Sequence, residues 1–188
     1  IDLINDLAFA FMDLLAWGQA ELAWRLVNGY VERSGDFDGL TGLRAFAAYR
    51  ALVRAKVALL SGQPEGFLRY WPLAESLAAD PAPPRLLLVM GLSGAGKSTL
   101  AAMLAEQSGA IRLRSDVERK RLHGLAATDR PTPGQDLYGT EATRATYARL
   151  VELADGLLAA GHSGVVDAAL LRQSERAALR QLAQRRHA

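Results

Sequence analysis

The sequence contains no cysteine and only three histidines in 188 residues. Without cysteine the chain has no disulfide, no thiolate nucleophile and no cysteine-ligated zinc, and because it is compatible with a reducing compartment we expect a cytoplasmic protein. The histidines, His123, His162 and His187, lie too far apart in the sequence to form a ligand-spaced pair. This spacing argues against a histidine metal site.

Long uncharged hydrophobic runs are also missing. Residues 1–30 are rich in apolar side chains, but Asp2, Asp6 and Asp13 interrupt them at intervals too short for a membrane span, which needs about 20 largely uncharged residues. The segment has neither the basic region nor the cleavage site of a signal peptide. Because the chain begins with Ile1 in the middle of a helical pattern, we expect it to be a piece of a longer protein.

The sequence has no large excess of one charge. Its 22 basic and 20 acidic residues give a formal net charge of +2. A balance of this kind does not indicate a nucleic-acid or membrane surface. We therefore expect no membrane partner, and binding to nucleic acid is not indicated.

Residues 1–79 show the periodicity of helices and no strand pattern. Residues 43–60 form a strong amphipathic pattern, and residues 67–79 form a further helical stretch in which Pro72 predicts either a kink or a late helix start. Earlier in the chain, apolar residues three or four positions apart predict the buried faces of helices. These residues are Ile4, Leu7, Phe11, Leu14 and Leu15, followed by Leu22, Leu26 and Val27.

The proline-rich residues 80–85, DPAPPR, predict a connector between two domains, 1–79 and 86–188. After the connector, strand and helix patterns alternate, which predicts a parallel sheet covered by helices on both faces. The predicted fold is therefore an α/β, P-loop NTPase-type domain with a partial sheet, preceded by an all-α segment. We expect strands at 86–90, 110–114 and 164–168, and helices at about 97–107, 116–123, 137–160 and 172–187.

A glycine-rich motif follows the first predicted strand. Residues 91–98, GLSGAGKS, satisfy G-x-x-x-x-G-K-[ST] at every fixed position. The glycines allow backbone amides to surround the β-phosphate of ATP, and the next helix presents its positive N-terminal end to the same anion. We expect Lys97 to reach the β- and γ-phosphates and the Ser98 hydroxyl to bind Mg²⁺. The predicted nucleotide-binding residues are Gly91, Leu92, Ser93, Gly94, Ala95, Gly96, Lys97, Ser98 and Thr99. The alternative is a plain glycine turn with a solvated Lys97.

The segment GVVDAAL, residues 164–170, has the composition of a Walker B strand. Its carboxylate, Asp167, would then hold Mg²⁺ or orient the attacking group. The alternative is a buried strand whose aspartate caps the next helix.

The second predicted strand, 110–114, delivers Ser115 and Asp116 to its carboxyl end, where open α/β sheets place their ligands. A carboxylate at that place can accept the proton of an acceptor hydroxyl as it attacks the γ-phosphate. Arg119 lies one helical turn later and would hold an anionic substrate or the transferred phosphoryl group. The alternative is a helix-capping Asp116 and an ion-paired Arg119.

Two further features are less specific. Arg172, Arg176 and Arg180 recur every four residues and share one helix face, which is more typical of a solvated basic face than of a substrate site. Residues 126–136 contain two prolines and a glycine, which is typical of a mobile loop on the substrate side.

Residues 85–188 resemble the bacterial P-loop kinases grouped as zeta-toxin-like or AAA-type predicted kinases, relatives of polynucleotide kinase and gluconate kinase. The pieces that carry the resemblance are VMGLSGAGKSTLA, LRSDVERKRLHGL, TYARLVELADGLLAAG and VVDAALL. The resemblance implies that Asp116 is a base or substrate ligand, that Arg119 contacts substrate and that Asp167 assists the metal. It also implies later strands, an arginine-bearing lid and a base-recognition loop, so we expect the kinase domain to be incomplete at residue 188.

Residues 1–79 are similar to the C-terminal helical part of an aminoglycoside-phosphotransferase-like domain, through IDLINDLAFAFMDL and GLRAFAAYRALVRAKVALL. The upstream half of such a domain would hold its nucleotide pocket and catalytic loop. We therefore assign no phosphotransferase activity to this segment.

Together these features predict a kinase that uses ATP and Mg²⁺ to phosphorylate a hydroxyl of a small molecule, with Lys97, Asp116 and Arg119 as catalytic residues and Ser98 and Asp167 as metal ligands. One alternative is a nucleotide-binding ATPase or regulatory switch without an acceptor. A nucleic-acid 5′-end kinase is another, although the sequence shows no aromatic and basic groove. The sequence does not indicate the acceptor, the choice between adenine and guanine, or the oligomeric state.

Overall fold

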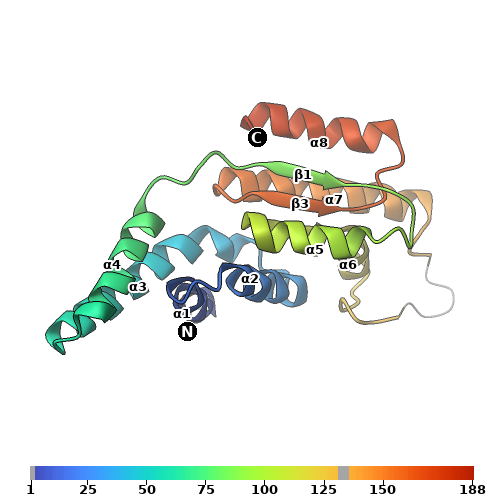
Figure 1. Ribbon diagram of the computed structural model, residues 1–188. Helices are drawn as coiled ribbons and strands as arrows, with labels where there is room; N and C mark the ends of the chain where they lie inside the picture. The colour runs from blue at the N-terminus through green and yellow to red at the C-terminus, as the bar shows by residue number, and fades with distance from the viewer. Residues whose placement is uncertain (1–2, 131–135) are drawn as a thin grey trace.

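The computed structural model describes residues 3–130 and 136–188 (Figure 1). Four α-helices and a short 3-10 helix come first: α1 Leu3–Ala16, α2 Ala20–Ser34, η1 Asp38–Gly42, α3 Leu43–Leu60 and α4 Pro64–Ala78. Alternating strands and helices then follow: β1 Leu86–Val89, α5 Lys97–Ser108, β2 Ile111–Arg114, α6 Ser115–Leu122, α7 Thr140–Ala159, β3 Gly164–Asp167 and α8 Gln173–Arg186. This order confirms the predicted α/β fold with an all-helical segment before it.

The three strands form a parallel sheet in the order β1-β3-β2. Val89 and Arg114 both lie opposite Asp167 in the register, so all three strands end at one edge of the sheet. Parallel strands need crossover connections, and α5 and α7 provide them. Loops at the carboxyl ends of the strands are therefore brought together, as the sequence predicted.

Helices cover both faces of this sheet, as predicted. On one face Val89 and Val165 pack against Ala101 and Ala105 of α5. On the other face Val166 belongs to the larger core, which includes side chains of α7 and α8. Neighbouring residues of a strand point to opposite faces, so the continuous aliphatic run of β3 reflects burial on both sides.

Helix α4 begins earlier than the sequence suggested. It starts at Pro64 and continues to Ala78 with Pro72 inside it. Pro64 lies in the first turn, where its missing N–H and fixed φ are compatible with a helix. The predicted start at residue 67 was therefore three residues late, and Pro72 does not mark the helix start.

Helix α7 begins later than predicted, at Thr140 instead of residue 137. Gly139 precedes it with φ −59° and ψ 166°, a non-helical conformation that defines the start of the helix. Leu137 lies outside the helix and is buried. Its apolar side chain extended the helical pattern without belonging to the helix.

The buried face of α2 differs in part from the predicted one. Ala23, Val27 and Val31 are buried, whereas Leu22 and Leu26 are exposed. Ala23, Val27 and Val31 belong to the core that the helices share, whereas Asn28 and Glu32 of α2 contact β2. The prediction is therefore confirmed for Val27 and wrong for Leu22 and Leu26.

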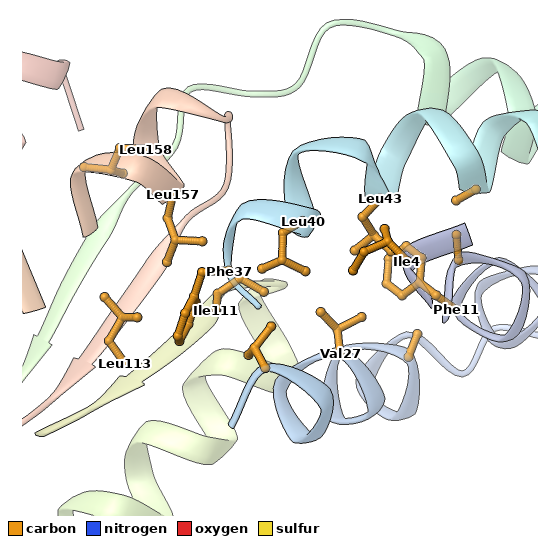
Figure 2. Packing of buried hydrophobic residues seen from close by; sticks show 14 of the residues in the cluster. Ile4, Phe11, Val27, Phe37, Leu40, Leu43, Ile111, Leu113, Leu157 and Leu158 are labelled. Atoms are coloured by element: carbon orange, nitrogen blue, oxygen red, sulfur yellow. The ribbon is translucent and has the colours of Figure 1, made fainter. Parts of the chain in front are cut away.

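The helical segment and the sheet share one core (Figure 2). Phe37, just before η1, and Leu40 of η1 lie in the same cluster as Ile111 of β2 and Leu157 of α7. The division into domains at residues 80–85 remains a prediction. Residues 3–79 nevertheless contribute buried surface to the sheet domain.

Asn28 of α2 pairs with the outer edge of β2. Its Nδ2 donates to the carbonyl oxygen of Ala110 at 3.0 Å, and its Oδ1 accepts from the backbone N–H of Arg112 at 2.7 Å. The buried amide thereby satisfies two backbone groups of an edge strand, which otherwise have no partner on that side.

We expect Asn28→Ala to lower the free energy of unfolding by about 3 kcal/mol, because two buried backbone groups lose their partners. Chemical denaturation followed by circular dichroism measures this change. Asn5→Ala is the control, since the side chain of Asn5 accepts a single bond from Arg50 Nε. Equal small effects of the two substitutions would contradict the assigned role of Asn28.

His162 joins the helical segment to the turn before β3. Its Nε2–H donates to the carbonyl oxygen of Leu40 at 2.9 Å, and the side chain is buried. Burial lowers the pKa of His162 below its usual range, while the hydrogen bond to Leu40 acts in the opposite direction. The ring is therefore neutral in the folded chain near pH 7.

The lowered pKa predicts an acid-sensitive stability. Below about pH 6.5 the unfolded chain binds a proton on His162 that the folded chain does not, so acidification favours unfolding. We expect His162→Gln to flatten the decrease of the unfolding free energy between about pH 7 and pH 5. His187→Gln alters an exposed histidine and is the control. Parallel pH profiles of the two variants would refute this role of His162.

Candidate functional site

The predicted phosphate loop connects β1 to α5, and Lys97 is the first residue of the helix. Gly94 and Gly96 have φ values of 80° and 77°. These positive values favour glycine, because a Cβ atom disfavours this backbone region. The structure therefore places the motif between a strand and a helix N-terminus, as phosphate binding requires.

Two contacts hold the loop in place. The backbone N–H of Gly91 donates to the carbonyl oxygen of Ala169, just after β3, at 3.2 Å. Lys97 Nζ donates to the carbonyl oxygen of Leu92 at 2.5 Å. The ammonium group thus lies over its own loop, where a phosphate group would be surrounded by backbone amides.

A cleft of about 630 Å³ opens at this edge of the sheet. It brings together five predicted site residues from α5, α6 and β3: Lys97, Ser98, Asp116, Arg119 and Asp167. Ser93, Gly94, Gly96 and Thr99 also line it, whereas Gly91, Leu92 and Ala95 belong to the loop without lining the cleft. Residues 70 positions apart in sequence therefore share one solvent-accessible site.

Asp167 ends β3 with only 5% of its surface exposed, and it lines the cleft. It is not the cap of the next helix, because α8 starts at Gln173 with Arg172 at the N-cap position. Within the described residues its ion-pair partner is Arg114, with Nε 3.9 Å from Oδ2. A buried carboxylate that faces a cleft without a close cation is available to bind a metal ion.

Asp116 lies in the first turn of α6, one residue after the helix begins. The N-cap position is occupied by Arg114, so the capping alternative for Asp116 is wrong. Its side chain is 48% exposed, and Oδ2 lies 3.2 Å from Lys120 Nζ. The carboxylate remains accessible from the cleft.

The Arg119 side chain is buried and makes hydrogen bonds to other residues of the chain. It is 8% exposed, and Nη1 donates to the carbonyl oxygen of Leu137 at 2.7 Å and to Thr143 Oγ1 at 3.2 Å. Its guanidinium also lies 5.0 Å from the ring centre of Tyr138. The arginine fixes the segment before α7 to α6 while still lining the cleft.

The predicted basic face, Arg172, Arg176 and Arg180, does not line the cleft. Arg176 Nη1 donates to the carbonyl oxygens of Leu170 and Leu171 at 2.6 and 2.8 Å, and so fixes the turn after β3. Arg172 and Arg180 are exposed, as expected for a solvated face.

The predicted loop at residues 126–136 is described only in part, because residues 131–135 lie outside the described residues. At its start, Asp129 Oδ2 accepts from the N–H of Ala126, and Lys120 Nζ donates to the carbonyl oxygen of Ala127. These contacts connect the beginning of the loop to α6.

Sequence reasoning missed three side chains that line the cleft: Arg114, Tyr138 and Tyr147. Burial raises the pKa of Tyr147, and its Oη accepts from the N–H of Leu170 at 3.1 Å. The signal for Arg114 was present in the alternation IRLR, which places Arg112 and Arg114 on one face of β2. Nothing in the sequence marked the two tyrosines.

The donor set of the cleft fits Mg²⁺. Ser98 offers a hydroxyl oxygen and Asp167 a carboxylate, and both line the cleft with Lys97. Mg²⁺ prefers hard oxygen ligands and takes few of them from the protein when phosphates supply the rest. Within residues 3–130 and 136–188, no three or more His, Cys, Asp or Glu side chains form a metal-binding group.

Comparison with known proteins agrees with this geometry. The family model described as "AAA domain" matches residues 86–188, more than half of the chain. The chain belongs to the AAA domain family. Its AAA domain is a P-loop nucleotide-binding, kinase-like domain.

Two kinds of relative support the assignment. A gluconokinase of Gluconobacter oxydans is 38% identical to this chain over 100 residues, which cover 52% of each protein. Uncharacterized proteins of Mycobacterium tuberculosis and Mycobacterium bovis are 35% identical over 195 residues. The match covers 100% of this chain and 39% of each mycobacterial protein. The chain thus spans well under half the length of these curated relatives.

No solved structure matches the chain significantly. Among the described helices, none combines the length and apolar character needed to cross a membrane.

Proposed function

We propose that the AAA domain transfers the γ-phosphate of ATP to a hydroxyl group of a small molecule, with Mg²⁺ as the metal. The observation that carries the proposal is the placement of the Asp116 carboxylate in the same cleft as Lys97, Ser98 and Asp167. A site that only bound a nucleotide would not need an accessible carboxylate on the far side of the phosphate loop.

Each residue has a role that its position supports. The loop amides and the N-terminus of α5 bind the phosphates, and Lys97 offsets negative charge on the transferred group. Asp116 accepts the proton of the acceptor hydroxyl. The hydroxyl oxygen forms a bond to the γ-phosphorus, and the bond between the γ-phosphorus and the bridging oxygen of ADP breaks. Ser98 and Asp167 hold Mg²⁺, which neutralises charge on the phosphate oxygens when it is bound. Arg119 holds the wall of the cleft formed by Tyr138.

We infer that the acceptor is a small polyhydroxylated molecule. Gluconate is the first compound to test, because one relative is named gluconokinase. A coupled assay of ADP release from Mg-ATP, in the presence of single polyols and sugar acids, identifies the acceptor, and phosphorus NMR identifies the product. We expect one acceptor class to raise ADP release well above the rate without acceptor. A rate that no hydroxyl compound changes would contradict the kinase proposal.

A second candidate is an ATPase that acts as a nucleotide-dependent switch. It is favoured by the direct contact of α2 with β2 and α5, which links the helical segment to the nucleotide loop. This candidate predicts slow hydrolysis without an acceptor and a different rate of proteolysis at residues 80–85 in ATP and ADP. Identical digestion in both nucleotides would count against it.

We also propose that residues 1–79 are the C-terminal helical part of an aminoglycoside-phosphotransferase-like domain joined to the kinase domain through residues 80–85. The four helices of this segment support the proposal. Its joint occurrence with the AAA domain in the mycobacterial relatives is also consistent with it.

A further inference from the structure

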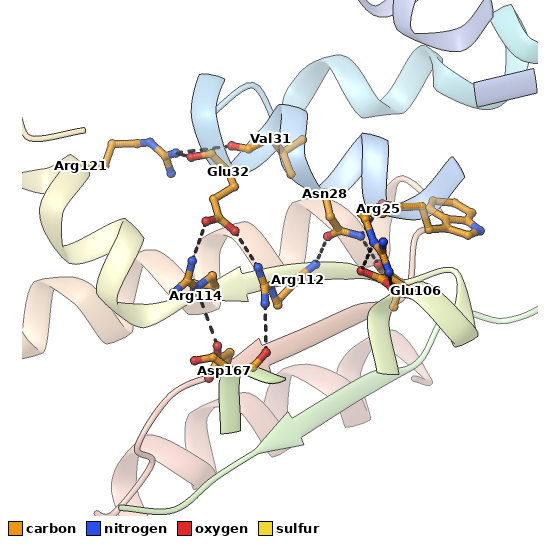
Figure 3. A network of polar contacts seen from close by, with 12 residues as sticks. Arg25, Asn28, Val31, Glu32, Glu106, Arg112, Arg114, Arg121 and Asp167 are labelled. Carbon is orange, nitrogen blue, oxygen red and sulfur yellow. Dashed lines mark hydrogen bonds and ion pairs between the residues drawn. The ribbon is translucent and has the colours of Figure 1, made fainter. Parts of the chain in front are cut away.

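Two arginines of β2 share one carboxylate of the helical segment (Figure 3). Glu32 of α2 lies with Oε2 2.8 Å from Arg112 Nη2 and with Oε1 2.5 Å from Arg114 Nη1. All three side chains are mostly shielded from solvent, with 16 to 27% of their surfaces exposed. Their pairing is therefore less weakened by water and salt than a surface ion pair.

Both arginines also contact residues of the candidate site. Arg112 Nη1 donates to the carbonyl oxygen of Ser98, in the first turn of α5, at 3.1 Å. Arg114 lines the cleft, and its Nε lies 3.9 Å from Asp167 Oδ2. Glu32 therefore contacts, through one arginine each, the two residues proposed to hold Mg²⁺.

The position of Glu32 is fixed from both sides. Asn28, one turn earlier on α2, is bound to the backbone of β2. Arg121 of α6 donates from Nη2 to the backbone carbonyl oxygen of Glu32 at 2.9 Å. The carboxylate is thus held over β2 by the packing of the helical segment and not by a flexible surface contact.

Arg114 lies between two carboxylates, and the distances show which one holds it. It makes a close pair with Glu32 and only a distant one with Asp167. Without Glu32, the nearest anion for this partly buried guanidinium is Asp167, whose buried position would favour a strong pair. Such a pair would occupy the oxygen lone pairs that a metal ion needs.

We propose that Glu32 is a positioning residue of the metal site: it holds Arg114 away from Asp167 and Arg112 against Ser98, so that both oxygen donors remain available to Mg²⁺. This inference rests on the proposed function, since it takes Ser98 and Asp167 as the metal ligands. It gives the helical segment, which lies outside the residues matched by the family model, a direct part in nucleotide binding.

The test measures how much Mg²⁺ the full chain needs to bind a fluorescent ADP analogue. We expect Glu32→Gln to raise the Mg²⁺ concentration for half-maximal binding about 10-fold or more, the range typical of partners that orient metal ligands. Binding of the analogue without Mg²⁺ should stay within about twofold of the unaltered chain, because Glu32 acts on the metal ligands and not on the phosphates.

Glu106→Gln is the matched control. It removes the partly exposed pair with Arg25, 2.7 Å apart, which joins α2 to α5 outside the cleft. A second variant, Glu32→Gln with Arg114→Gln, removes the competing arginine as well. Its Mg²⁺ concentration for half-maximal binding should return close to that of the unaltered chain. If Glu32→Gln does not fold, Glu32→Asp keeps the charge and should give a smaller shift in the same direction.

The outcomes separate this inference from the proposed function. If Glu32→Gln leaves the Mg²⁺ concentration for half-maximal binding unchanged, the inference is overturned and the proposed function is not. The same holds if Glu106→Gln raises this concentration equally, or if the double variant keeps the raised value. If the unaltered chain binds no Mg²⁺-nucleotide at all, the proposed function fails and the inference fails with it.

Discussion

Asp116→Asn is expected to reduce acceptor-dependent phosphoryl transfer by about 100- to 10,000-fold, the range typical of the loss of a general base. Asparagine is close in shape to aspartate, but it cannot accept the proton of the attacking hydroxyl. The position of Asp116 in the first turn of α6 leaves the phosphate loop untouched. The affinity for Mg-ATP should therefore change by less than about threefold, and kcat should carry the loss.

The control for this variant is Glu141→Gln, which removes an exposed carboxylate from the first turn of α7 outside the cleft. Steady-state ADP release at several acceptor concentrations separates kcat from KM, and calorimetry reports nucleotide binding. Full turnover in Asp116→Asn would show that another group accepts the proton. Loss of nucleotide binding would instead make Asp116 part of the nucleotide site.

Lys97→Ala is expected to weaken Mg-ATP binding by about 10- to 100-fold, because it removes a charge-assisted bond worth about 1.5–3 kcal/mol. Turnover should fall further, since the ammonium group also offsets charge in the transition state. Displacement of a fluorescent nucleotide measures the affinity, and ADP release measures the turnover.

Lys56→Ala is a suitable control, because Lys56 is exposed on α3 far from the phosphate loop. The fold of Lys97→Ala should remain intact, since the ammonium group bonds to the carbonyl oxygen of Leu92 in an exposed loop. Equal affinity of Lys97→Ala and the unaltered chain would mean that the loop does not bind phosphate in the expected way.

The sheet domain was largely predictable from the sequence. Strand β1 is apolar throughout, β3 is apolar up to Asp167, and β2 alternates aliphatic residues with arginines. The glycine motif predicted one strand-to-helix junction. The observed strands differ from the predicted ones by one residue at an end. The parallel order β1-β3-β2 follows from tertiary pairing, which no local pattern records.

The helical segment was less predictable, because packing decided its details. Leu22 and Leu26 extended the apolar stripe of α2, but the packing of α2 against the other helices buries Ala23 and Val27 instead. Pro72 signals a helix boundary by local rules, yet the surrounding helix continues through it.

The phosphate loop, Asp116 and Asp167 were placed correctly at one edge of the sheet, because parallel strands bring their carboxyl ends together. The bond from Arg119 to Leu137 and the link from Glu32 to Asp167 through Arg114 were not foreseen. They join residues separated by 18 and by more than 80 positions, and a single sequence holds no signal for such contacts.

The central claim is that this cleft binds a nucleotide together with Mg²⁺, and calorimetric titration of the unaltered chain with Mg-ATP tests it most directly. The account predicts saturable binding to one site, weakened when Mg²⁺ is removed and lost or greatly reduced in Lys97→Ala. Absence of any binding heat across several temperatures, with the chain folded, would contradict it.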